Sequence, residues 1–234
     1  STEAGLRNGS IWANCMWLKG VVMKAHYNGL IPRNPFIQFH ISPNVKEREY
    51  LTEDELKAVM THEFADSKLA YIRDIFIFAS FTALSFVDIQ ELTNDNIVEV
   101  NGEKWILSKR HKTKVAFQVK LLDIPLQIVE RYRPMQKDNR IFPGLNYWSI
   151  CKPLKRMIRE CGITKSISFH CSRHGFATLA LSKGMPIESV SRVLGHTNIV
   201  TTQLYAKITT QKLDNDLTMF GDKLSKTFNG ITMS

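Results

Sequence analysis

A short β pattern inside an otherwise helical sequence is the feature that most limits the fold of this 234-residue chain. Residues 98–100 and 104–108 are predicted strands, and Asn101-Gly102 between them is typical of a type I′ hairpin turn. Residues 115–121 supply a third strand. Because helical periodicity flanks this segment on both sides, the sequence predicts a mainly α fold with one small antiparallel sheet, an α+β class.

Helix start and stop signals divide the rest of the chain. A capping box at Thr52-x-x-Glu55 begins one helix, Gly195 ends another, and Ser168 and Asn198 are predicted to cap two more. The predicted helices cover residues 10–28, 52–62, 67–80, 87–92, 125–132, 146–161, 169–183, 186–194 and a segment that carries Tyr205.

The first predicted helix is separated from the others by residues 36–49, which have the composition of a linker. A lone amphipathic helix cannot bury its own apolar face. We therefore expect residues 1–35 to be the C-terminal part of a truncated first domain. Residues 50–234 form the second domain, with a tail helix at about 209–226.

Composition narrows the class of partner. The formal net charge of +9 favours a polyanion such as nucleic acid. The cysteines form no CxxC pair, which is typical of reduced thiols in a cytosolic protein. The longest apolar run, near residues 75–81, is too short to span a membrane, and no export signal opens the chain. The four cysteines are Cys15, Cys151, Cys161 and Cys171.

Four residues in the second half could together bind and attack a phosphodiester. His170 and Arg173 lie three apart in the first turns of a predicted helix, where an anion is favoured. His196 follows Gly195, and Tyr205 offers a phenolic oxygen. Taken singly, three of them have an ordinary explanation: Arg173 as a surface cation, His170 as a half-buried residue, and Tyr205 as a core aromatic.

A basic turn covers residues 109–114 between the second and third predicted strands. Such a turn can hold a DNA backbone, or a lysine in it can protonate a departing alkoxide. A solvated cluster without function is the ordinary alternative. The cations that concern us are Lys109, Arg110, Lys112 and Lys114.

A metal site is the competing interpretation of the histidines. His170 and His174 have the i, i+4 spacing of a zinc helix, with His196 as a third ligand. However, Cys171 stands where a zinc hydrolase helix carries its glutamate, and Arg173 would repel a dication. We therefore predict no metal and no other cofactor.

Together these residues resemble the tyrosine recombinase (phage-type integrase) family. The matching pieces are His170-x-x-Arg173-His174-Gly175, Leu194-Gly195-His196, and Tyr205 within residues 201–206. Lys112 falls at the family's hairpin lysine, and residues 81–89 resemble the turn that carries the family's first arginine. The resemblance covers about residues 50–210 and implies the family's catalytic domain, with residues 1–35 as the end of its core-binding domain.

The resemblance implies a mechanism. Tyr205 attacks a DNA phosphodiester to give a 3′-phosphotyrosine and a free 5′-hydroxyl, and a second strand reverses the step without ATP or metal. Arg173, His170 and His196 stabilise the transition state, and Lys112 is the general acid. Asp88 supports the site, while Lys109, Arg110, Lys114 and His174 contact DNA.

One departure from the family pattern concerns Ser85, which stands where the first arginine belongs. Loss of one preorganised donor costs about 2.7–4 kcal/mol of transition-state stabilisation. Integrases of Bacteroides-type mobile elements are similar at this position. Arg73 and Arg110 are candidate substitutes, although each is more readily explained as a structural or DNA-contacting residue.

The resemblance also implies partners and a place in the cell. We expect a cytoplasmic, nucleoid-associated bacterial enzyme that acts on double-stranded DNA sites during integration or excision of a mobile element. It would form a homo-oligomer on DNA, a tetramer in the synapse, with DNA-bending proteins as optional accessories. A DNA-binding protein that no longer cuts and a type IB topoisomerase remain alternatives.

Overall fold

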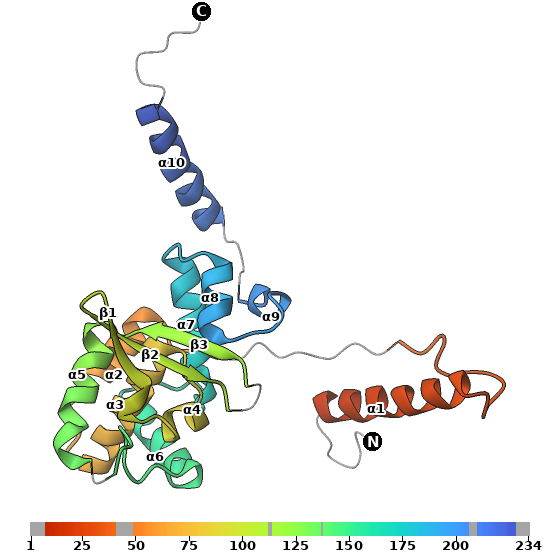
Figure 1. The fold of residues 1–234 in the computed structure, drawn as a ribbon, viewed down its shortest axis with the longest axis horizontal. Coiled ribbons are helices and arrows are strands. Elements are labelled where there is room, and N and C mark those ends of the chain that lie inside the picture. The colour runs from red at the N-terminus through yellow and green to blue at the C-terminus, as the bar shows by residue number, and fades with distance from the viewer. Residues whose placement is uncertain (1–7, 41–48, 112–113, 137, 206–209, 228–234) are drawn as a thin grey trace, which may run out of the picture. The chain divides into compact units, whose positions relative to one another are not determined.

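The computed structural model describes residues 8–40, 49–111, 114–136, 138–205 and 210–227 (Figure 1). The chain divides into two compact units, residues 1–48 and residues 49–234. Its helices and strands are α1 (Asn8–Tyr27), α2 (Glu53–Thr61), α3 (Ser67–Thr82), α4 (Phe86–Gln90), the 3-10 turn η1 (Asn94–Asn96), β1 (Ile97–Val100), β2 (Glu103–Lys109), β3 (Ala116–Lys120), α5 (Asp123–Tyr132), η2 (Arg133–Met135), α6 (Tyr147–Glu160), α7 (His170–Ser182), α8 (Ile187–Leu194), α9 (Val200–Gln203) and α10 (Thr210–Thr227). The predicted mainly helical fold with one small sheet is confirmed.

The first unit contains α1 and the turns that follow it. Helix α1 ends as predicted near Asn28-Gly29, where Gly29 adopts a left-handed φ of 70°. None of its side chains is buried, and Trp17 is 73% exposed. This agrees with the expectation that α1 alone cannot cover its apolar face.

None of the helices in the described ranges is both long and apolar enough to cross a membrane.

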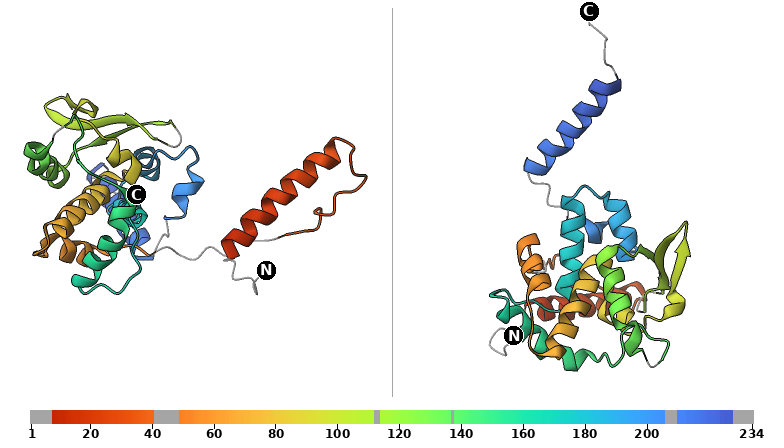
Figure 2. Two further views of the ribbon diagram at one scale, coloured as in Figure 1. Left: turned by 90° about the horizontal axis from the view of Figure 1, so that it is seen from below. Right: turned by 90° about the vertical axis from the view of Figure 1, so that its left-hand side faces the viewer.

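Helix α3 is the centre of the second unit. It packs against α2, α5, α6 and α7, which lie around it (Figures 1 and 2). The four side chains predicted to point inward, Leu69, Ile72, Phe76 and Ala79, are all buried. At its end, Ala83 takes a left-handed φ of 56° and turns the chain into α4.

The sheet has the order β1-β2-β3 and is antiparallel throughout. Asn101 and Gly102 have φ values of 53° and 77°, as a type I′ turn requires, so the predicted hairpin is confirmed. Ile106 and Phe117 face the core from β2 and β3. Strand β3 also packs against α8, which brings the β2–β3 hairpin close to the end of that helix.

Buried side chains form two clusters in this unit. The larger surrounds α3, and the smaller lies between α7 and α8 around Ala83, Ala177 and Leu194. Tyr205 packs against the smaller cluster. The segment after α3 and the start of α7 thus connect the two clusters.

Two local predictions were wrong. Ser168 does not cap α7: Phe169 occupies the cap position, and the Ser168 hydroxyl lies 3.3 Å from Cys171 Sγ. Helix α9 ends at Gln203, so Tyr205 lies just beyond it and not two turns inside a helix. Asn198 does accept a hydrogen bond from the Val200 backbone N–H at 2.9 Å, as a cap at that end would.

Candidate active site

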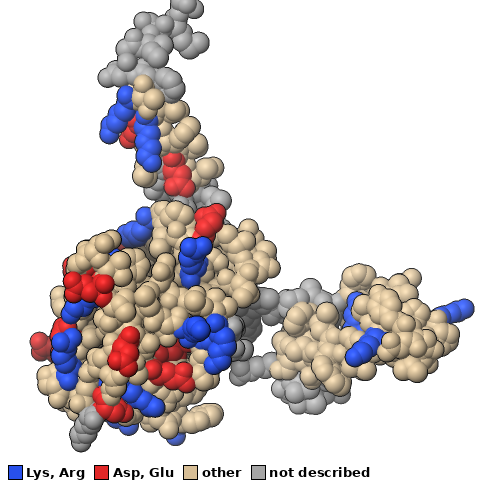
Figure 3. Space-filling model, viewed as in Figure 1, with Lys and Arg blue, Asp and Glu red and all other residues tan. Residues whose placement is uncertain are grey.

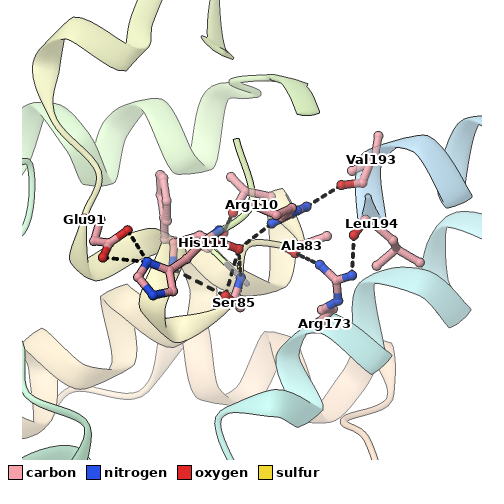
Figure 4. A network of polar contacts seen from close by, with 11 residues as sticks. Ala83, Ser85, Glu91, Arg110, His111, Arg173, Val193 and Leu194 are labelled. Atoms are coloured by element: carbon pink, nitrogen blue, oxygen red, sulfur yellow. Dashed lines mark hydrogen bonds and ion pairs between the residues drawn. The ribbon is translucent and has the colours of Figure 1, made fainter. Parts of the chain in front are cut away.

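Arg173 extends from the first turn of α7 between two other segments (Figure 4). Its Nη1 donates to the carbonyl of Ala83 at 2.9 Å, and its Nη2 donates to the carbonyl of Leu194. Burial, together with the charge of Arg110, lowers the pKa of Arg173 to about 10. That pKa is still well above 7, so the group is a cation held in a poorly solvated place.

His196 follows the left-handed Gly195 that ends α8. Its Nδ1 lies 2.9 Å from the hydroxyl of Thr202, a fully buried residue of α9. Burial, with the charges of Arg173, Arg110 and His170, lowers the pKa of His196 to about 4. The imidazole is therefore neutral at pH 7. Because Thr202 occupies Nδ1, the other ring nitrogen is left for a ligand.

Tyr205 is half-buried and lies among these groups. Its ring centroid is 5.1 Å from that of His174, which is 4.7 Å from that of His170. Tyr205 also acts electrostatically on Arg173, as a phenolic oxygen near the guanidinium would. The structure thus brings together His170, Arg173, His196 and Tyr205, as the sequence motifs predicted.

Asp88 is a buried acceptor on α4. Its Oδ2 receives hydrogen bonds from the Ser85 hydroxyl and from Arg110 Nη1, both at 2.7 Å. The backbone N–H of His111 donates to its Oδ1 at 3.0 Å. Burial alone would raise the pKa of Asp88, but these hydrogen bonds and the charge of Arg110 hold it below the ordinary value. Asp88 is therefore ionised at neutral pH.

The two guanidinium groups lie side by side at the carboxyl end of α8 (Figure 4). Arg110 Nη2 donates to the carbonyl of Val193 at 2.5 Å, and Arg173 donates to that of the next residue, Leu194. Unpaired carbonyls at a helix end carry partial negative charge, which favours cations there. The end of α8 thus orients both arginines.

The basic turn is not uniform. Lys109 and Lys114 are exposed, whereas Arg110 is 5% exposed and packs over the ring of Phe117 at 4.0 Å. Arg110 therefore differs from the surface DNA contact that the sequence predicted. Lys112 lies outside the described residues, so its role as general acid stays a prediction.

Arg73, the other candidate substitute for the missing arginine, belongs to a different network. Its Nε pairs with Asp74 at 2.8 Å and its Nη1 donates to the carbonyl of His62 at 2.8 Å. Asp74 is also bound by Arg131 and Tyr132 of α5. Arg73 thus ties α3 to its neighbours near the start of that helix, while Ser85 lies beyond its other end.

The two arginines of the site are shielded from solvent to different degrees, because Arg110 is buried and Arg173 is half-buried. On the face seen in Figure 3, acidic and basic side chains of the second unit are interspersed and form no single basic surface. Within the described residues, no group of three or more His, Cys, Asp or Glu side chains is arranged to hold a metal ion.

Sequence reasoning missed two contributions. Thr202 was unremarkable within a short polar helix, although a hydroxyl six residues after His196 is within reach of the ring across the turn. The carbonyls of Val193 and Leu194 carry no residue-type signal. The only indication was Gly195, since a glycine that ends a helix leaves the last carbonyls without helical partners.

Sequence comparisons agree with this geometry. The phage integrase family matches the chain over residues 49–212. Tyrosine recombinase XerA of Pyrococcus horikoshii is 32% identical over 177 residues, which are 70% of this chain and 58% of the relative. Tyrosine recombinase XerD of Listeria innocua is 26% identical over 204 residues, 80% of this chain and 67% of the relative. The chain thus spans 58% and 67% of the lengths of these relatives.

Solved structures share the fold. The Tn1549 transposon integrase in complex with a circular intermediate DNA superimposes with a TM-score of 0.79 at 18% identity, covering 93% of this chain and 81% of that one. A lambda integrase dimer bound to a COC′ core site gives a TM-score of 0.62 at 19% identity, covering 80% and 69%. The predicted likeness to a tyrosine recombinase catalytic domain is confirmed.

Proposed function

Since this chain belongs to the phage integrase family, we propose that it breaks and rejoins DNA strands through a covalent bond between Tyr205 and a 3′ phosphate. The observation that carries this proposal is the convergence of Tyr205 with Arg173, His170 and His196 at one place in the fold. A purely structural tyrosine would not need the guanidinium group of Arg173 beside it.

The proposed step is a transesterification. The Tyr205 oxygen forms a bond to phosphorus while the bond from phosphorus to the 5′ oxygen breaks. The phenol loses one proton and the 5′ oxygen gains one, so the proton count is unchanged. One phosphodiester replaces another, and the reverse attack by a 5′-hydroxyl restores DNA without ATP. Lys112 is proposed as the acid for the leaving oxygen, on the family resemblance.

Arg173 is proposed to bind the scissile phosphate. Two of its five N–H groups are accounted for by Ala83 and Leu194, which leaves three for a ligand. The carbonyl bonds fix the fork before DNA arrives, and a preorganised donor in a poorly solvated site stabilises developing charge more than a mobile one does.

His196 is proposed as a neutral donor in free enzyme. With Nδ1 beside Thr202, a proton on Nε2 would be available for a non-bridging phosphate oxygen. The same charges that lower its pKa would be offset by a bound phosphate, so DNA should raise that pKa. His170 adds a further donor, and His174, whose ring lies next to Tyr205, is proposed to contact DNA.

We also propose that the chain works as a homo-oligomer on double-stranded DNA, a tetramer when two sites are paired. The apolar side chains of α10 recur at helical spacing and all are at least 40% exposed: Leu213, Leu217, Phe220 and Leu224. A second protomer is the proposed partner of this face. The biological setting would be integration or excision of a mobile element in the bacterial cytoplasm.

A nicked suicide duplex tests the chemistry. It carries the attachment site from the genome that encodes the chain, and the nick lets the cleaved end diffuse away so that covalent protein–DNA accumulates. We expect a covalent band with wild type, with chelator present, and none with Tyr205→Phe. Binding without any band would favour the alternative of a DNA-binding protein that does not cut.

A second assay separates the recombinase from a type IB topoisomerase. Relaxation of a supercoiled plasmid without an attachment site would favour the topoisomerase. A requirement for two specific sites and exchange of strands between them would favour the recombinase.

A further inference from the structure

Because Ser85 stands where the family has its first arginine, the start of α4 lacks the positive charge that this arginine would supply. Ser85 caps this helix: its hydroxyl accepts from the Asp88 backbone N–H at 3.3 Å and donates to the Asp88 carboxylate at 2.7 Å. A hydroxyl so engaged supplies neither a cation nor a two-pronged donor. Among the described residues of α4, only Asp88 is both buried and charged, and its charge has the wrong sign for a phosphate.

Arg110 delivers a guanidinium to this place from another element. It follows β2 directly, and its side chain reaches across to Asp88 on α4, 22 residues away in sequence, and to Val193 on α8, 83 residues away. The side chains of Arg110 and Asp88 are 6% and 4% exposed. A buried ion pair needs additional hydrogen bonds to be tolerated, and Ser85 and His111 supply them to Asp88.

The charge at this place does not balance within the described residues. Arg110 and Arg173 are close enough that the charge of one lowers the proton affinity of the other, and Asp88 is the carboxylate that acts on both. Two guanidinium groups against one carboxylate leave a net positive charge in a poorly solvated seam. A phosphate diester is the kind of anion that would neutralise it.

One donor of Arg110 is unused. Its Nε is buried and has no hydrogen-bond partner among the described residues. Buried polar atoms without a partner are rare in proteins, and a catalytic role or a bound ion is among the explanations for them. The Nε lies against Gly195, the residue before His196, and a Cβ at Gly195 would come within 2.9 Å of it. The free donor is thus next to the proposed phosphate-binding histidine.

We infer that Arg110 is the second phosphate-binding arginine of this enzyme, held by Asp88 and by the Val193 carbonyl in the place that Ser85 cannot fill. The inference rests on the proposed function, since it assigns a residue to the same reaction. Arg110 and Arg173 together would neutralise the two non-bridging oxygens as Tyr205 attacks. Arg73 is excluded from this role by its bonds to Asp74 and His62.

The test compares two suicide duplexes that differ in one atom group. One has the natural scissile phosphate, and the other has a methylphosphonate, in which a methyl group replaces one charged oxygen. A cation that neutralises this oxygen no longer stabilises the transition state when the oxygen's charge has been removed. We expect Arg110→Met to slow formation of the covalent adduct by about 10²–10³-fold on phosphate. On the methylphosphonate duplex, the ratio of the variant's rate of adduct formation to the wild-type rate should be closer to one.

Two further variants keep this test independent of folding. Methionine retains apolar contact with Phe117, and Arg110→Lys retains the charge opposite Asp88, so at least one variant should melt cooperatively near wild type. Arg73→Met is the matched control: it removes a half-buried arginine that is paired with a buried aspartate, and any loss of rate should be the same on both duplexes. Equal losses on the two duplexes for the Arg110 variants would overturn the inference.

A second experiment places an arginine at position 85, where the family has its first arginine. Ser85→Arg alone should leave the rate unchanged or lower, because Arg110 already occupies the Asp88 carboxylate. In the Arg110→Met background the same Ser85→Arg change should recover part of the lost rate. A sharp increase from Ser85→Arg alone would mean that no substitute is present. Absence of any Tyr205-dependent adduct with wild type would instead count against the proposed function itself.

Discussion

Arg110 lies against Gly195 so closely that a Cβ at this glycine would be 2.9 Å from Nε and 3.1 Å from Cγ. The glycine is therefore required twice, for its left-handed φ of 62° at the end of α8 and for the space it leaves. The two requirements can be separated by experiment.

Gly195→Ala should lower both stability and activity. A left-handed alanine costs about 1 kcal/mol or more of unfolding free energy, and the Cβ would also displace Arg110. Gly184→Ala is the control, because Gly184 has φ 87° and a Cβ added there would meet no atom within 4 Å. Urea unfolding and adduct formation are the measurements. We expect Gly184→Ala to lose only the stability that the left-handed alanine costs, and Gly195→Ala to lose more stability and also cleavage; equal cleavage rates would contradict the steric requirement.

Asp88→Asn should be strongly destabilising. It leaves the buried guanidinium of Arg110 without its counter-ion, for which the expected cost is about 3–5 kcal/mol. Glu130→Gln serves as comparison, since its pairs with Lys104 and Arg133 are largely exposed and should contribute at most about 1 kcal/mol. Chemical denaturation at pH 7 measures both. If both variants lose the same small amount of unfolding free energy, Asp88 does not stabilise Arg110 as described.

His196 should make stability depend on pH between about 4 and 6.5. Its pKa falls from the ordinary 6.5 to about 4 on folding, so in this window the unfolded chain binds the additional proton. The free energy of unfolding therefore rises with pH across the window, and the contribution is lost as pH falls through 4. His196→Gln should reduce the rise in unfolding free energy by the part that one titrating histidine contributes. An unchanged slope would show that the histidine titrates normally.

Truncation after Ile208 should weaken pairing of DNA sites more than binding of one site. It removes α10 with its exposed Leu217 and Phe220, the face proposed to contact a second protomer. Gel-shift titration with one site and with two sites measures the two affinities. Replacing Leu217 and Phe220 with serine in the full chain is the matched control and should act in the same direction. Equal weakening of both complexes would argue against a role between protomers.

Local signals predicted most elements because those elements depend on neighbours in sequence. The capping box at Thr52, the Asn101-Gly102 turn and the stop at Gly195 all formed as expected. Tyr205 was placed inside a helix because Asn198 signalled a start, and no comparable signal showed that α9 ends at Gln203.

The part of the site that sequence could not predict depends on long-range contacts. Four cations in residues 109–114 are alike in composition, and only the fold shows that Arg110 turns inward to Asp88 and Val193 while Lys109 and Lys114 remain exposed. The pairing of Thr202 with His196 is equally invisible to motif analysis, because any hydroxyl near a histidine in sequence has the same pattern.

The carboxyl end of α8 has a consequence for how this site fails. Val193 and Leu194 hold Arg110 and Arg173 through adjacent carbonyls, and Gly195 and His196 continue directly from them. Fraying of a single helical turn would release both cations and shift the histidine at once. Damage to this turn should therefore abolish cleavage, whereas loss of one of the two arginine side chains should only slow it.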